Sequence, residues 1–273
     1  MKVQRWINVL VALNIVFLSW GQYIPQREVV VAIDFTASTT NQGVVFGDVS
    51  VLKSLTNKTI CASVNAESFG TFNTIFHINH SAVGATLKGY ALLLSTGKIR
   101  FAVGWTGSTA EVAYWDSDAA LSLSTNYRIC VTYNNSSTAN DPIFYVNGAS
   151  VALTEVGAPV GTVIDSGGTT KIGGYGIASG SPFDGLVGNA MVYNRIFSAA
   201  EALEDYASRG ASHNDYGLVF HAPCISAAGI QTFDGATLTA TSYIYDRISG
   251  LKGTPAGNPV GVADTVLTYV DDH

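Results

Sequence analysis

The sequence predicts an all-β protein, built as a two-sheet antiparallel sandwich with one short helix and extensions at both termini. Runs rich in Val, Ile, Tyr and Phe recur about every ten residues with glycines and polar turns between them, which favours a sandwich over a parallel α/β sheet. Charged residues make up only 12% of the 273 residues. A chain of this length can bury a large core, so one large domain or a domain with a small appendage is expected.

The strands of the first half follow from alternation and from turn formers. In the run 59–64, small polar and apolar residues alternate, as they do in a strand with one buried face. Thr96-Gly97-Lys98 predicts a tight hairpin turn. The expected strands cover residues 28–35, 59–64, 73–78, 89–95, 98–104 and 111–115.

The second half has the clearest alternation, in the run 127–133, where Tyr127, Ile129, Val131 and Tyr133 share one face. A strand over 143–146 leads into Asn147-Gly148, which suits the positive φ angles of a type I′ turn. A further strand is expected over 186–193.

One helix is predicted to begin at Ser198, because Ser198 and Glu201 have the spacing of a capping box. Leu203 and Tyr206 form a short apolar stripe, and Gly210 suits the C-terminal end. Glu204 and Asp205 are expected to be solvated.

Five of these signals occur in the order of a known family. They are the strand led by Tyr127, the Phe144-Tyr145-Val146-Asn147-Gly148 strand and turn, Ile172-Gly173, Phe183-Asp184-Gly185, and Tyr193-Asn194-Arg195 before the capping box. Together they resemble the laminin-G-like (LamG, concanavalin A-like) domain over roughly residues 29–208, although Tyr127 stands where the family usually has Trp. The resemblance implies a jelly-roll sandwich over 29–210.

The two ends of the chain are expected to lie outside this sandwich. In residues 1–28, two basic residues precede an apolar run at 6–20, which is typical of a signal peptide cut near Gly21; the alternative, which we favour, is a retained β-rich arm. The run is too short for a stable membrane span.

Residues 211–273 are predicted to form a β-rich appendage. The strand-like 217–222 and the motif Asp246-x-x-Ser249-Gly250 look like the opening of such a domain, but they follow it here. Three roles are open for this segment. It is a partial repeat of the domain, it completes the sheet of a neighbouring subunit, or it adds edge strands to the sandwich of its own chain. Contacts with neighbouring subunits are expected through 1–28 and 211–273.

The chain has three cysteines, Cys61, Cys130 and Cys224, without a CxxC motif, so a structural zinc site is not supported. An odd count also argues against a disulfide-built scaffold. Three unpaired small residues are the preferred interpretation, and a Cys61–Cys130 disulfide is the alternative.

Charge and acidic residues exclude some functions. The formal net charge is −6 and no cluster of Lys and Arg occurs, so no nucleic-acid partner is expected. Asp116 and Asp118 are two residues apart, but they are expected in a loop after Trp115 and lack a third partner. Because retaining glycosidases need two carboxyl groups about 5 Å apart, the sequence does not predict an enzyme.

Aromatic and acidic residues supply the candidate ligand site. Trp105, Trp115, Tyr90 and Tyr114 could stack on sugar rings, although at least half of them are expected to fill the core. The resemblance implies calcium as a possible cofactor, with oxygen ligands such as Asp141 and Asp184; Asp184 has the alternative role of holding its own turn. No cofactor is expected to be required.

The sequence therefore leads to three functional hypotheses. The first is a non-catalytic structural and recognition protein of an extracellular or virus-particle assembly, which contacts glycans or neighbouring subunits at the particle surface. The second is a secreted lectin-like carbohydrate-binding module. The third and least favoured is a glycoside hydrolase of the same fold.

Overall fold

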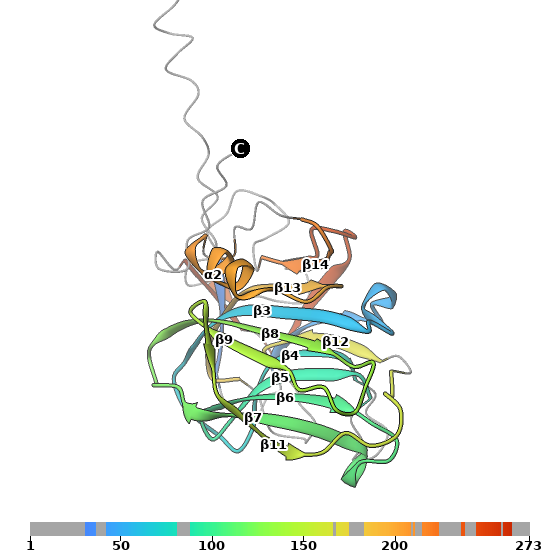
Figure 1. Ribbon diagram of the computed structural model, residues 1–273. Helices are drawn as coiled ribbons and strands as arrows, with labels where there is room; N and C mark the ends of the chain where they lie inside the picture. Colours follow the sequence, from blue (N-terminus) through green and yellow to red (C-terminus); the bar gives the residue numbers. More distant parts are fainter. Residues whose placement is uncertain are drawn as a thin grey trace, which may run out of the picture.

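The computed structural model describes residues 31–36, 42–80, 88–165, 168–174, 183–208, 210, 215–223, 236–237, 244–257 and 259–263. The described strands form two antiparallel sheets that pack face to face (Figure 1). This is the predicted jelly-roll sandwich. The N-terminal segment 1–28, interpreted as an arm or a signal peptide, lies outside the described residues.

Sheet A has the order β10-β9-β8-β3-β13-β1-β18-β15, and β14 pairs with β13 beside this path. Its strands are β1 (Val31–Phe35), β3 (Asn57–Ala66), β8 (Asn126–Asn134), β9 (Ile143–Val146), β10 (Ala149–Val151), β13 (Gly185–Tyr193), β14 (Leu218–Ala222), β15 (Ala236–Thr237) and β18 (Val260–Ala263).

Sheet B has the order β11-β7-β6-β5-β4-β12-β2-β17-β16. Its strands are β2 (Gly43–Gly47), β4 (Asn73–His80), β5 (Tyr90–Ser95), β6 (Lys98–Gly104), β7 (Val112–Ala120), β11 (Leu153–Gly157), β12 (Thr169–Ile172), β16 (Ile244–Tyr245) and β17 (Lys252–Ala256). Two short 3₁₀ turns accompany them, η1 (Ser50–Leu52) and η2 (Thr109–Glu111).

The strands that follow residue 210 join these same two sheets. β14 pairs with β13, β17 with β2, and β18 with β1. Of the three alternatives for 211–273, the described part of this segment therefore adds edge strands to its own sandwich.

The core lies between the sheets and is rich in aromatic rings. The ring centroids of Trp115 and Tyr133 are 5.2 Å apart, and those of Phe101 and Tyr133 are 5.6 Å apart. Tilted and edge-to-face pairs at these distances add to the free energy gained from burial. The predicted hairpin turns are present as well: Thr96-Gly97 and Asn147-Gly148 all have positive φ angles.

One helix, α2 (Ala199–Ala207), covers the outer face of sheet A (Figure 1). The predicted capping box is confirmed, since Ser198 accepts from the backbone N–H of Glu201, and the Glu201 carboxylate accepts from that of Ser198. The predicted stripe is wrong: Leu203 and Tyr206 are exposed, and the buried residues are Ala202 and Asp205.

Ser198→Ala should lower the free energy of unfolding by about 1 kcal/mol, because the N–H of Glu201 loses its acceptor. Chemical denaturation of the full chain measures this value. Ala200→Ser, at an exposed helical position two residues later, is the control and should change stability by less. Equal effects of the two substitutions would contradict a role for the cap.

The preferred interpretation of the cysteines is wrong, because Cys61 and Cys130 form a disulfide. The register of β3 and β8 places the two residues directly opposite each other, with Cα atoms 4.1 Å apart. The cysteine count obscured this pairing; the third residue, Cys224, lies outside the described residues.

A buried polar network links this face of sheet A to its neighbours. Arg128 donates from Nε and Nη2 to the two oxygens of Asp205 on α2, at 2.7 and 2.9 Å. Its Nη1 donates to the carbonyl oxygen of Asn189 at 2.7 Å. The expectation that Asp205 is solvated is therefore wrong, since its side chain is only 1% exposed.

In the described parts of the chain, no helix is long and apolar enough to cross a bilayer.

Candidate functional site

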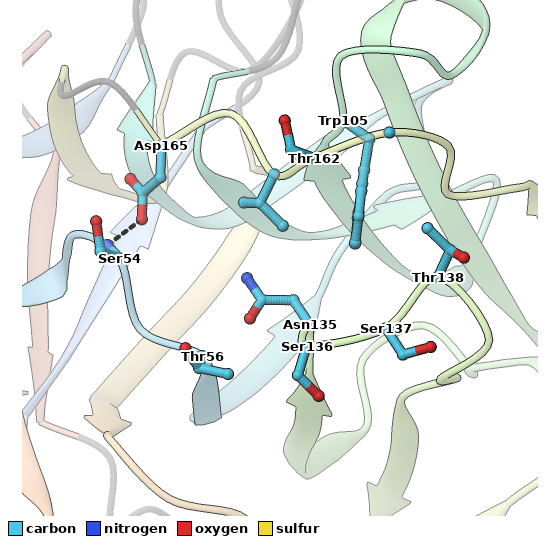
Figure 2. A pocket seen from close by; sticks show the side chains of 11 residues that line it. Ser54, Thr56, Trp105, Asn135, Ser136, Ser137, Thr138, Thr162 and Asp165 are labelled. Atoms are coloured by element: carbon cyan, nitrogen blue, oxygen red, sulfur yellow. Dashed lines mark hydrogen bonds between the residues drawn. The ribbon is translucent and has the colours of Figure 1, made fainter.

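A pocket of about 610 Å³ opens at one end of the sandwich, where β3 begins and β8 ends (Figure 2). We call it the rim pocket. Its walls come from the segment before β3, the loop after β8, the residue that follows β6, and the segment before β12. The lining residues are Ser54, Thr56, Trp105, Asn135, Ser136, Ser137, Thr138, Gly161, Thr162, Val163 and Asp165.

Most of this lining offers neutral hydrogen-bonding groups. Six of the eleven residues are Ser or Thr, and Asn135 adds an amide. Asp165 supplies the one carboxylate in this described lining, and it accepts a hydrogen bond from the backbone N–H of Ser54 (Figure 2). A surface of this kind can donate to and accept from a ligand that carries many hydroxyl groups.

Backbone hydrogen bonds hold the two loop walls in place. The backbone N–H of Thr106 donates to the carbonyl of Thr162 at 2.9 Å, so the segments after β6 and before β12 form a short ribbon. The loop after β8 is fixed by Asn134, whose Oδ1 accepts from the backbone N–H of Ser136 at 2.8 Å. This Asx turn is a local structure that Asn favours. The pocket is therefore preformed, as ligand sites usually are.

Trp105 forms a wall of the pocket and is itself only 2% exposed. Its Nε1 and the Tyr133 hydroxyl have no hydrogen-bond partner of normal geometry among the described residues. Burial raises the pKa of Tyr133, and the nearby Trp105 indole acts in the opposite direction. Because an unpaired buried polar group is unfavourable by about 1–3 kcal/mol, a ligand or water oxygen that reached either group would be stabilised.

A buried amine lies behind Asn135. Lys58 is 1% exposed, and its Nζ lies 5.3 Å from the centroid of the Tyr90 ring and 5.5 Å from that of Tyr133. With its amide oriented to suit both neighbours, Asn135 accepts from Lys58 Nζ at 3.2 Å and donates to the carbonyl of Thr56 at 2.8 Å. Burial lowers the pKa of Lys58 to about 7, and Asp165 opposes that shift.

The four predicted aromatic residues do not form one site. Trp105 lines the rim pocket, and Tyr114 lines a separate pocket on the outer face of sheet B. Tyr90 and Trp115 belong to the core, where the Tyr90 hydroxyl donates to the carbonyl of Leu52 at 3.0 Å. Trp105 also belongs to the core cluster, so burial agrees with the expectation that at least half of the four fill the interior.

The two predicted calcium ligands lie at opposite ends of β3, so they cannot share one ion. Asp141 follows β8 at the end where Asn134 pairs with Asn57, and its Oδ1 accepts from Trp115 Nε1 at 2.8 Å. Asp184 precedes the residue that pairs with Ala66 at the other end, and it accepts from the Ser68 hydroxyl. Calcium binding itself stays a prediction.

The structure corrects the expected placement of Asp116 and Asp118, which lie in β7 rather than in a loop. The strand continues because Asp116 pairs with both Arg100 of β6 and Thr154 of β11. The Asp116 carboxylate is held by Arg100 at 2.6 and 2.7 Å, and Asp118 accepts from the Thr154 hydroxyl at 2.8 Å.

Two features of the rim pocket were missed in the sequence. The residues 135–138 read only as a polar loop, and nothing local distinguishes a binding loop from a connecting one. Lys58 did leave a signal, because it precedes the predicted strand 59–64 on the same face as Ile60. A lysine at an inward-facing position of a strand indicates a buried amine.

The fold is shared with several solved structures. A Bacteroides ovatus protein that is thought to bind carbohydrate superposes with a TM-score of 0.57 at 17% identity, covering 88% of this chain and 61% of that chain. The present chain thus spans about three fifths of that protein's length. A search of curated protein sequences finds no match.

Two smaller proteins are similar in the same way. A heptameric SAP-like pentraxin from Limulus polyphemus has a TM-score of 0.50 at 16% identity, covering 67% of this chain and 84% of its own. The CBM40 domain of the Ruminococcus gnavus IT-sialidase, bound to α2,3-sialyllactose, has a TM-score of 0.50 at 17% identity. The match covers 63% of this chain and 95% of the CBM40 chain. At these identities the likeness concerns the fold alone.

The sequence itself assigns the family. The model of Laminin_G_3, described as the concanavalin A-like lectin/glucanases superfamily, matches residues 38–202, which is more than half of the chain. The match spans β2 to the first turn of α2 and includes every wall of the rim pocket. The protein therefore belongs to the Laminin_G_3 family of concanavalin A-like lectins and glucanases.

Proposed function

We propose that this protein is a secreted carbohydrate-recognition module that binds a sugar in the rim pocket and does not cleave it. The observation that carries the proposal is the lining, in which six hydroxyl side chains and an amide surround Trp105. Such a pocket replaces the hydration of a saccharide with preformed donors and acceptors. Carbohydrate recognition also accords with the solved structures of similar fold.

The acidic residues support binding without hydrolysis. Asp165 is the one carboxylate in the described lining, whereas glycosidases of the common type use a pair. Asp116 and Asp118 are engaged by Arg100 and Thr154. The Cys61–Cys130 disulfide supports an extracellular location, because disulfides persist in oxidising compartments.

A structural role in a virus particle or another assembly is less supported. That hypothesis depends on subunit contacts through 1–28 and 211–273. The first segment lies outside the described residues, and the described strands β14, β17 and β18 pair within this chain. We therefore favour the lectin-like hypothesis.

A substitution that fills the rim pocket tests the proposal. Thr138 lines the pocket and is exposed, so Thr138→Trp should occupy it without disturbing the core. We expect at least about tenfold weaker binding, equivalent to about 1.4 kcal/mol, of a glycan first identified on a glycan array. Isothermal titration calorimetry on the full chain measures the dissociation constants.

Ala139→Trp is the matched control, because Ala139 is exposed in the same loop but does not line the pocket. It should bind like the parent protein. The proposal fails if no glycan binds on the array, or if both Trp variants bind as tightly as the parent. Release of reducing sugar from the bound glycan would instead revive the hydrolase hypothesis.

A further inference from the structure

A second pocket, of about 500 Å³, lies on the outer face of sheet B. Alternation creates this face: Leu92, Phe101 and Trp115 point into the core, so their neighbours point outward. The cross-strand register brings Ala102 beside Tyr114 and Leu93 beside Arg100. We call it the sheet-face pocket. It is lined by Phe72, Leu93, Arg100, Ala102, Thr109, Ala110, Val112, Tyr114, Val156, Gly157 and Ala158.

Arg100 is held rigidly in this pocket. Its Nε and Nη2 donate to the two oxygens of Asp116 at 2.6 and 2.7 Å, in the fork geometry that fixes a guanidinium in one plane. Two aromatic rings lie beside it, with the Arg100 Cζ atom 4.3 Å from the centroid of Tyr114 and 5.4 Å from that of Phe72. Cation–π contacts at these distances are favourable.

The clamp leaves Nη1 of Arg100 without a hydrogen-bond acceptor among the described residues. Arg100 lines the pocket, and its side chain is 16% exposed. The charge of Arg100 is already balanced by Asp116. The pocket therefore offers a rigid donor pair to a neutral oxygen, and it has no net charge that would favour an anion.

The rest of the lining is mostly apolar, and four of its residues are Ala or Gly. Ala102 and Val112 lie around Tyr114, and Val156 is exposed at the border. Gly157 makes room for the tyrosine, because a Cβ atom there would lie 2.7 Å from Tyr114 Cε1. These residues leave space for a methyl-sized apolar group beside an aromatic face.

Backbone strain marks the same place. Ala110 and Glu111 have φ angles of 54° and 55°, in the left-handed region that residues with a Cβ atom rarely adopt. Ala110 lines the pocket. Such strain is unfavourable by about 1–3 kcal/mol for each residue and is found most often at functional sites.

We propose that the sheet-face pocket is a second sugar subsite, which binds the acetamido group of a neutral N-acetylated sugar. The acetamido methyl contacts Ala102 and Val112, and the carbonyl oxygen accepts from Nη1 of Arg100. The sugar ring packs its C–H face against Tyr114. The inference extends the proposed carbohydrate recognition, but it uses different residues, so the two subsites can fail separately.

Saturation-transfer NMR of the full chain with N-acetylglucosamine tests this subsite. Glucose and glucosamine are the control ligands, since they share the ring and lack the acetyl group. We expect the strongest transfer at the acetyl methyl and at least about tenfold weaker binding of glucose. Equal affinity for N-acetylglucosamine and glucose would overturn the inference.

Substitutions locate the binding. Val156→Trp should fill the border of the sheet-face pocket and weaken N-acetylglucosamine binding about tenfold. Val160→Trp is the matched control, because Val160 lies in the same segment, has a similar exposure (49% against 50%) and does not line the pocket. Arg100→Lys, which keeps the charge and loses the fork, should also weaken binding.

The rim variant separates the two proposals. Thr138→Trp should leave N-acetylglucosamine binding unchanged at the sheet-face pocket. If Thr138→Trp abolishes it and Val156→Trp does not, the sugar binds at the rim; the sheet-face subsite is then wrong and the proposed function stands. If Val156→Trp abolishes N-acetylglucosamine binding and Thr138→Trp weakens the binding of no glycan, the rim proposal fails and the sheet-face subsite stands.

Discussion

Arg128→Met should lower the free energy of unfolding by about 3–5 kcal/mol, which is the usual effect of removing one partner of a buried ion pair. The Arg128 and Asp205 side chains are 4% and 1% exposed. Without the guanidinium, the Asp205 carboxylate would remain buried beside Cys130, whose Sγ lies 3.3 Å away. That sulfur is part of the disulfide and has no hydrogen to donate.

Urea denaturation at neutral pH measures this effect, with two controls. Lys53→Met removes the exposed Lys53–Asp48 pair and should change stability by less than about 1 kcal/mol. Arg128→Met combined with Asp205→Leu removes both charges and should recover much of the loss, since paired apolar replacements are often neutral. If Arg128→Met is no more destabilising than Lys53→Met, the buried pair does not hold α2 on the sheet.

Gly210 packs closely against this pair. Its backbone N–H donates to the carbonyl of Asp205 at 2.7 Å, and its φ angle is 78°. A Cβ atom there would lie 2.2 Å from Asn189 Nδ2 and 2.9 Å from Arg128 Nη2. The sequence indicated Gly210 as a helix end from its conformational freedom alone, whereas the structure adds a steric reason.

Local signals in the sequence predicted local structure well. The turn at Asn147-Gly148 and the capping box at Ser198 depend on residues within four positions of each other, so their chemistry is visible in the chain. The strand 98–104 was predicted with the observed bounds of β6. The order of five such signals was enough to indicate the family that the profile match confirms.

Features that depend on register or on tertiary contact were not predicted. The Cys61–Cys130 disulfide requires that β3 pair with β8 at one register, across 69 residues of sequence. Asp205 is read as solvated from the helix pattern, because its partner Arg128 lies 77 positions away. The rim pocket combines four segments, and two of them, the segment before β3 and the loop after β8, contribute only small polar residues.

The buried imidazole of His221 should make the protein lose stability in acid. Burial lowers the pKa of His221 to about 3, and the positive charges of Arg247 and Arg128 act in the same direction. The unfolded chain takes up a proton on this ring near pH 6.5, whereas the folded protein does so only near pH 3. The free energy of unfolding should therefore fall with decreasing pH across that window, by about 1.4 kcal/mol per pH unit.

His221→Gln isolates this effect from the titration of carboxylates. His221 Nε2 lies 2.7 Å from Asn189 Oδ1, which can only accept, so the neutral ring donates there, and a Gln amide can do the same. Asn189 itself has a φ angle of 47° at a bulge of β13, a conformation that Asn tolerates. Between pH 6.5 and 4, the parent should lose about 3 kcal/mol more than the variant in urea denaturation. Parallel pH curves would show that His221 takes up its proton at the same pH in the folded and the unfolded protein. The folded network would then hold a third positive charge beside those of Arg128 and Arg247.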